Sequence, residues 1–100
     1  MKLIGIMSMQ DDRAVVRDLL RDRGVSIYSE TDITGHSTET IARYGWFARP
    51  AEAATYAALS FAIVPDDAAT AVFEAIAAHQ QASPGDHPIR AFIVPVEKMV

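Results

Sequence analysis

Apolar residues fall along this chain in short runs that predict four strands. Residues 2–7 (KLIGIM) are apolar on both alternating faces, with Ile4 and Ile6 on one side, which is typical of a central strand. Residues 55–64 (TYAALSFAIV) form a second apolar run, whereas 25–33 (VSIYSETDI) is more polar and indicates an edge strand. A last strand is predicted over 89–96, where Pro95 favours an edge because proline has no N–H for the ladder.

Two stretches with helical spacing separate these strands. The first carries an apolar stripe formed by Val15, Val16, Leu19 and Leu20, and Gly24 is a suitable helix stop. Residues 8–12 can cap its start, because acidic residues favour the positive end of a helix. The second helix is predicted to start at Pro65-Asp66-Asp67 and to present Ala69, Val72, Phe73 and Ile76 on one face, with a turn at 83–86 after it.

The resulting order βαββαβ predicts a ferredoxin-like α+β fold. In it, a four-stranded antiparallel sheet carries both helices on one face, the first and third strands are central, and a long loop joins strands two and three. No linker or repeat interrupts the chain, so residues 1–100 are expected to form a single domain.

The third strand alternates large and small residues, which bears on assembly. We expect Leu59, Phe61 and Ile63 to pack under the helices, and the small residues Ala58, Ser60 and Ala62 to form the outer face. Because an outer face of small residues lets a second sheet approach closely, this pattern predicts a homo-oligomer built sheet against sheet.

The segment 35–55 is unusually long for a loop within a small domain, and loops of this length are commonly functional. It holds the only tryptophan of the chain in the run Arg43, Tyr44, Gly45, Trp46 and Phe47. These residues suit a surface that contacts a partner, although Trp46 could equally anchor the loop on its own subunit.

Composition narrows the possible functions. The net charge of −4 argues against nonspecific binding to nucleic acid or anionic membranes. There is no apolar run long enough to insert into a membrane and no signal-peptide pattern. The absence of cysteine excludes thiolate chemistry and fits a cytoplasmic protein. No Ser-His-Asp, Walker or zinc-protease pattern is present, so we do not expect an enzyme.

Several segments together resemble the P-II (PII) signal-transduction proteins and their PII-like relatives. MKLIGIM matches the first strand of that family, RAVVRDLLRDRGV its first helix, and Ser29 to Gly35 the strand end that enters its T-loop. The run IVPDD at 63–67 matches its strand-to-helix junction, and Gly85-Asp86 falls in its phosphate-binding B-loop. The segment 35–55 has the position of the T-loop, with Arg43-Tyr44-Gly45 near its tip.

This resemblance implies a non-catalytic homotrimer with nucleotide sites between subunits and a T-loop that regulates a membrane transporter or an enzyme. No cofactor is required, and an adenine nucleotide is the expected small-molecule effector. The nucleotide-binding residues that the resemblance implies are Ser29, Gly35, His36, Val64, Gly85, Asp86, His87 and Arg90.

The chain also departs from the family pattern. The usual B-loop lysine is replaced around His87-Pro88, and the arginines that follow the last strand are missing. Because a triphosphate needs several cations to offset its charge, we expect AMP, ADP or a small anion rather than ATP.

Two other interpretations remain open, and a third is disfavoured by the net charge of −4. A metal-responsive PII-like or CutA-like protein would bind a divalent transition metal through His36 and His87, whereas His79 near the end of the second helix suits a capping role. An amino-acid-binding ACT-like module has the same element order but usually accompanies an enzyme domain. An RNA-recognition motif also has this order but needs exposed aromatics on its central strands and a basic face.

Overall fold

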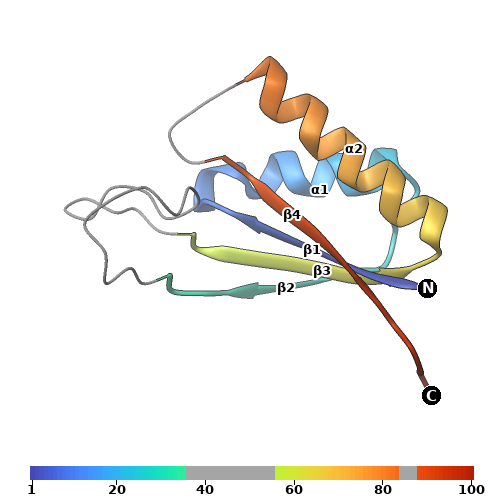
Figure 1. Ribbon diagram of the computed structural model, residues 1–100. Helices are drawn as coiled ribbons and strands as arrows, with labels where there is room; N and C mark the ends of the chain where they lie inside the picture. The colour runs from blue at the N-terminus through green and yellow to red at the C-terminus, as the bar shows by residue number, and fades with distance from the viewer. Residues whose placement is uncertain (36–55, 84–87) are drawn as a thin grey trace, which may run out of the picture.

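Two helices cover one face of a four-stranded antiparallel sheet (Figure 1). This computed structural model describes residues 1–35, 56–83 and 88–100. Its elements are β1 (Lys2–Ser8), the 3-10 turn η1 (Gln10–Asp12), α1 (Arg13–Asp22), β2 (Ser29–Asp32), β3 (Ala58–Val64), α2 (Asp66–Ala82) and β4 (Arg90–Pro95). The strand order β2-β3-β1-β4 makes β1 and β3 central and confirms the predicted ferredoxin-like α+β fold.

The core lies between the helices and the inner face of the sheet. Ile4 and Ile6, which share one side of β1 as predicted, point into the core, and both are buried. The helices contribute Val16, Leu20, Ala69, Val72 and Ile76. The predicted stripe of α1 is thus confirmed, because Val15 and Leu19 also pack against this core.

The ends of α1 agree only in part with the prediction. Gly24 has φ of 82°, a left-handed conformation that glycine adopts without steric cost, and it ends the helix as expected. At the start, however, Ser8 is the last residue of β1, and no side chain caps η1 or α1 by a hydrogen bond. The prediction that residues 8–12 cap the helix is therefore wrong for side-chain capping, because Ser8 belongs to β1 and no side chain of this segment bonds to the helix start.

The second strand is shorter than predicted, since only Ser29–Asp32 pair with β3. The amide of Val25 donates to the carbonyl oxygen of Leu20 (3.0 Å), and its side chain is buried. Residue 25 therefore closes α1 instead of opening a strand. β3 likewise begins at Ala58 rather than at residue 55.

The two faces of β3 are inverted relative to the prediction. Its small residues Ala58, Ser60 and Ala62 are buried under the helices, whereas Phe61 and Ile63 are about 40% exposed on the outer face (38% and 41%). Alternation separates the two sets of side chains but does not reveal which set the helices cover. Here β1 and the helices supply the large core side chains, so β3 has space for small ones only.

Pro95 occupies an edge position, as predicted. The amide of Val96 donates to the carbonyl oxygen of Met1 (3.2 Å), so residue 96 directs its backbone groups towards β1. Because backbone direction alternates along a strand, the nitrogen of Pro95 faces away from β1. The proline therefore removes no hydrogen bond from the sheet.

Candidate functional site

Three described segments meet at one end of the sheet. β2 ends there, β3 begins there, and β4 begins there (Figure 1). In the register, Asp32 lies opposite Ala58, Ala58 opposite Ser8, and Met7 opposite Arg90. We call this the loop end of the sheet, since residues 35 and 56 border the 36–55 segment, and residues 83 and 88 border the 84–87 segment.

Tyr56 links two of these segments. Its side chain is 4% exposed, and its hydroxyl donates to the carbonyl oxygen of Pro88 (2.6 Å). Burial raises the pKa of the Tyr56 hydroxyl, and the nearby Arg90 guanidinium offsets part of that effect. Tyr56 thus ties the residue after the 36–55 segment to the residue after the 84–87 segment, so that the position of one depends on the other. Nothing in the sequence pattern indicates this role of Tyr56.

Two of the predicted nucleotide-binding residues lie at the loop end. Gly35 follows β2 and Arg90 opens β4, where it is exposed. Ser29 lies opposite Phe61 nearer the middle of the sheet, and Val64 lies opposite Lys2 at the far end. Within one chain the fold therefore brings Gly35 and Arg90 to the same end of the sheet but does not bring Val64 there.

The other predicted site residues fall outside the described residues. For the nucleotide site these are His36, Gly85, Asp86 and His87, and for the partner-binding loop they are Arg43, Tyr44, Gly45, Trp46 and Phe47. Their roles stay predictions. Among the described residues no group of three or more His, Cys, Asp or Glu side chains could hold a metal ion.

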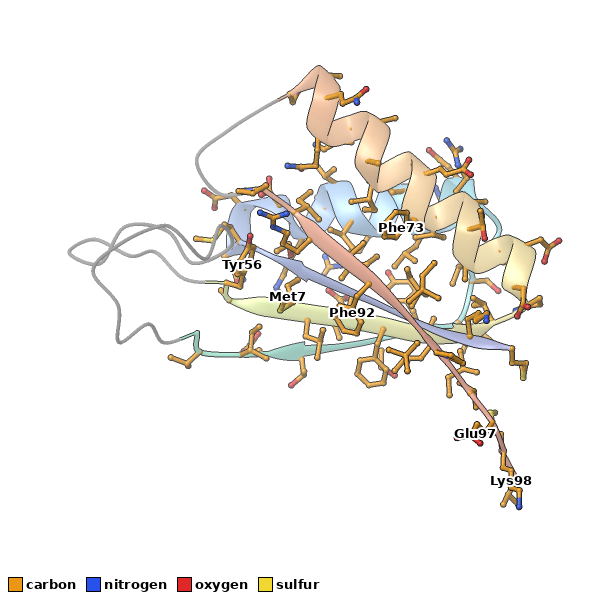
Figure 2. All side chains as sticks on the ribbon, viewed as in Figure 1. Met7, Tyr56, Phe73, Phe92, Glu97 and Lys98 are labelled. Atoms are coloured by element: carbon orange, nitrogen blue, oxygen red, sulfur yellow. The ribbon has the colours of Figure 1, made fainter. Side chains whose placement is uncertain are left out.

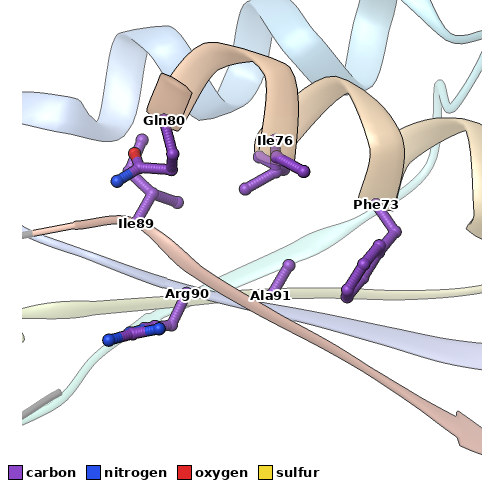
Figure 3. Close-up of a pocket in the computed structure, with 7 residues that line it drawn as sticks. Phe73, Ile76, Gln80, Ile89, Arg90 and Ala91 are labelled. Atoms are coloured by element: carbon purple, nitrogen blue, oxygen red, sulfur yellow. The ribbon is translucent and has the colours of Figure 1, made fainter. Parts of the chain in front are cut away.

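A groove of ≈ 280 Å³ lies between α2 and β4 (Figure 3). Phe73, which was expected on the same face of α2 as the buried Ala69, Val72 and Ile76, is instead 42% exposed and lines this groove together with Ile76 and Ala91. Figure 3 shows Ile89 and Ala91 pointing towards α2, whereas the side chain of Arg90 points away. The groove is thus mainly apolar, and none of the described residues that line it directs a charged group into it, so it offers little to a phosphate.

A second cavity of ≈ 330 Å³ lies at the loop end, between the start of α1, the end of α2 and the segment before β4. It is lined by Asp12, Val15, His79, Gln80, Ser83, Pro88 and Ile89. The carboxylate of Asp12 opposes binding of an anion in it. Arg90 therefore remains the described cation best placed at the loop end for a phosphate.

The outer face of the sheet is mainly apolar, and in the described part of the chain no helix lies over it (Figure 2). Three rows of side chains cross it in register: Ile63, Leu3 and Val94; Phe61, Gly5 and Phe92; and Leu59, Met7 and Arg90. The four largest exposed members, Phe61, Ile63, Phe92 and Val94, have between 38% and 42% of their surface accessible. A contiguous exposed apolar surface of this kind marks an interaction site.

In the part of the chain that the structure describes, neither helix is long and apolar enough to span a bilayer. Comparison of the sequence with protein-family models and with curated proteins finds no match. Similarity is found at the level of three-dimensional structure instead.

Solved structures of PII-like proteins superimpose on most of this chain. The apo form of CPII from Thiomonas intermedia K12, a nitrogen regulatory PII-like protein, has a TM-score of 0.66 at 16% identity and covers 93% of this chain and 85% of its own. The same protein bound to ADP, AMP and bicarbonate gives 0.62 at 18% identity, with 99% and 94% covered. A PII-like signalling protein from Thermus thermophilus gives 0.61 at 16%, with 93% and 83% covered.

These similarities extend over nearly the whole of each chain. They confirm, at the level of three-dimensional structure, the resemblance seen in the sequence. The chain therefore has the fold of the PII-like nitrogen regulatory proteins.

Proposed function

We propose that this chain is a non-catalytic, cytoplasmic regulatory protein of the PII-like type. It assembles as a homotrimer, binds an adenine nucleotide or a small anion at the clefts between subunits, and regulates a membrane transporter or an enzyme through the 36–55 segment. The observation that carries the proposal is the fold shared with CPII, a structure of which contains ADP, AMP and bicarbonate.

The outer face of the sheet supports assembly. The inversion of β3 places Phe61 and Ile63 on this face instead of Ala62, so the face is larger and more apolar than the sequence pattern suggested. Burial of apolar surface stabilises association by roughly 25 cal/mol per Å² before the cost of association is subtracted. Packing three such faces around a common axis would cover them all, which supports a closed trimer over an open chain of subunits.

The charge at the loop end supports a weakly charged ligand. Arg90 carries a guanidinium, a group whose planar N–H donors suit a phosphate or a bicarbonate. AMP, ADP and bicarbonate need fewer compensating cations than ATP. Tyr56 follows the 36–55 segment, Pro88 follows the 84–87 segment, and Tyr56 lies near Arg90. A ligand bound at Arg90 would therefore lie close to residues that border both segments.

Calorimetry with AMP, ADP, ATP and bicarbonate tests the ligand. We expect AMP or ADP to bind more tightly than ATP, and Arg90→Ala to weaken binding at least about tenfold, because a charge-assisted hydrogen bond contributes roughly 1.5–3 kcal/mol. Arg21→Ala is the matched control, since the described partners of Arg21 are Asp18 and Asp22 on its own helix. The absence of heat with all four compounds, together with tight binding of copper, nickel or zinc that His36→Ala or His87→Ala removes, would replace this proposal by the metal-responsive one.

Light scattering tests the assembly separately. The expected mass is three times that of the chain, and Phe61→Glu should shift it towards the monomer, because the substitution buries a carboxylate in the proposed interface. Glu74→Gln on exposed α2 is the control that should leave the mass unchanged. A monomeric wild-type protein at micromolar concentration would refute the trimer without deciding the ligand.

A further inference from the structure

Two ion pairs connect α1 to the strand that leads into the 36–55 segment. Arg17 Nε donates to both carboxylate oxygens of Glu30, at 3.0 and 3.3 Å. Arg13 Nη2 contacts Asp32 Oδ1. Glu30 and Asp32 both belong to β2, the short edge strand that precedes Gly35.

The spacing of the two pairs is matched. Arg13 and Arg17 are four residues apart, which is about 6 Å along a helix. Glu30 and Asp32 are two residues apart, which is about 6.7 Å along a strand and places both on one face. The pairs run in opposite order, Arg13 with Asp32 and Arg17 with Glu30, so α1 lies antiparallel to β2 and the two elements meet in register.

The small residues of β3 make this arrangement possible. Asp32, Ala58 and Ser8 form one row across the sheet, and Glu30, Ser60 and Ile6 form the next. Ala58 and Ser60 are buried on the helix side, next to the two carboxylate-bearing residues of β2. Side chains as small as these leave space above β3 for arginines to reach from α1 across to the edge strand.

β2 has few other attachments. Among the residues that the structure describes, β2 pairs only with β3, and most of its residues are exposed. The amide of Ile33, just beyond its end, donates to the carbonyl oxygen of Ala57 (3.0 Å), and by alternation the amide of Thr31 also faces β3. A strand with so little buried surface depends strongly on additional contacts to stay in place.

We propose that Arg13 and Arg17 form an electrostatic clamp that holds β2 on α1 and thereby fixes the position from which the 36–55 segment leaves the sheet. The clamp weakens as the ionic strength rises. Salt, or a competing anion bound to these arginines, therefore loosens the attachment of β2 to α1, while the pairing of β3, β1 and β4 is retained. The regulatory meaning of the clamp rests on the proposed function of the 36–55 segment, but its existence does not.

The exposure of the four side chains predicts an asymmetry. Arg13 is 18% exposed and Asp32 is 86% exposed, whereas Arg17 is 48% and Glu30 is 21% exposed. Removing the exposed partner leaves a partly buried charge without compensation, which is more harmful than the reverse. Asp32→Asn should therefore loosen β2 more than Arg13→Gln, and Arg17→Gln more than Glu30→Gln.

Amide hydrogen exchange measured by NMR tests the clamp on the whole chain without ligand. The reporter is the amide of Ile33, and the internal reference is the amide of Ala57, which donates to the carbonyl oxygen of Ser8 (3.0 Å) and so reports the attachment of β3 to β1. We expect Arg17→Gln to accelerate exchange at Ile33 about fivefold relative to Ala57, and the Arg13→Gln/Arg17→Gln double variant about tenfold or more, as ion pairs of this exposure allow.

Two further arms make the test specific. The charge-swapped variant Arg17→Glu/Glu30→Arg should restore slow exchange, and the control Arg21→Gln should leave it unchanged, because Arg21 pairs with Asp18 and Asp22 on α1 itself. Raising the NaCl concentration about tenfold should accelerate exchange at Ile33 in the wild type but not in the double variant, because salt weakens ion pairs between solvent-exposed side chains. Equal acceleration at Ile33 and Ala57, an effect of Arg21→Gln as large as that of Arg17→Gln, or failure of the swap would each overturn the clamp. None of these outcomes depends on nucleotide binding or on assembly.

Discussion

Replacing Gly5 by alanine probes the outer face of the sheet directly. Gly5 lies between Phe61 and Phe92 in the middle row of that face. A Cβ atom at position 5 would lie 2.2 Å from Cζ of Phe92 and 2.6–2.7 Å from its Cε atoms. Carbon atoms in contact are separated by about 3.5 Å or more. The ring of Phe92 therefore has to move by more than about 1 Å.

Two opposing effects set the size of the change. Phe92 is 38% exposed, so its ring can swing into solvent and lose its contact with β1. Full burial of a phenylalanine contributes about 1.5–3 kcal/mol, so losing most of this partial burial costs about 1–2 kcal/mol. Alanine in place of glycine within a strand contributes about 0.5–1 kcal/mol in the other direction. The single substitution should thus destabilise by no more than about 1.5 kcal/mol.

A double-mutant cycle separates these two effects. In urea unfolding at one fixed protein concentration, Gly5→Ala should destabilise the wild type slightly or leave it unchanged, but it should stabilise the Phe92→Ala variant by about 0.5–1 kcal/mol. The coupling between the two positions should be at least about 1 kcal/mol. A cycle with Phe61→Ala is the control and should show a smaller coupling. The reasoning fails if Gly5→Ala has the same effect in the Phe92→Ala variant as in the wild type.

Three further predictions concern other parts of the fold. Tyr56→Phe should cost about 1 kcal/mol, because the hydrogen bond to Pro88 is lost. Burial raises the pKa of Tyr56 in the folded state, so its hydroxyl contributes stability that is present below its unfolded pKa and is lost as the pH rises above about 10. Thermal unfolding of the wild type, measured from neutral pH to about pH 11, should therefore show a loss of stability at alkaline pH. The loss should be smaller in Tyr56→Phe. Ala62→Phe should destabilise the folded chain by about 1–3 kcal/mol in urea unfolding, because Ala62 is buried under the helices. A position on the outer face would instead act chiefly on assembly. Unchanged unfolding together with a changed mass of the assembly would therefore contradict the orientation of β3. Gly24→Ala should cost about 1–2 kcal/mol because φ is 82° there, and an unchanged melting temperature would show that the chain can end α1 in another way.

The element order and the sheet order followed from the sequence because polarity differs between central and edge strands. The runs at 2–7 and 55–64 are apolar on both faces, whereas Glu30 and Asp32 mark β2 as an edge and Pro95 marks β4. The orientation of β3 did not follow. Its alternating pattern puts large and small residues on opposite faces, but only the packing of Ile4, Ile6 and the helices decides which of the two faces is inside.

The sequence predicted a site residue only where the charge of its side chain suggested a ligand, and not where the role depends on a contact made by folding. Arg90 was recognised as a cation near a turn, and the structure places it at the loop end. Tyr56 was missed, because its partner is the backbone carbonyl of Pro88, 32 residues away in the chain, and nothing in the sequence encodes that contact. The pairing of Arg13 and Arg17 with β2 was missed for the same reason, since helical spacing marks them only as a polar face.

The outward-facing nitrogen of Pro95 has a consequence for the behaviour of the protein at high concentration. An edge strand that offers a continuous row of N–H and C=O groups invites other chains to add to it and to grow into fibrils. On the side of β4 that faces away from β1, residues 91 and 93 can each offer both groups, whereas residue 95 can offer only its carbonyl oxygen. At the opposite border, β2 is only four residues long. The sheet therefore presents two short borders that resist fibril growth, and Pro95→Val, which would lengthen one of them, should make the protein more prone to form amyloid-like aggregates.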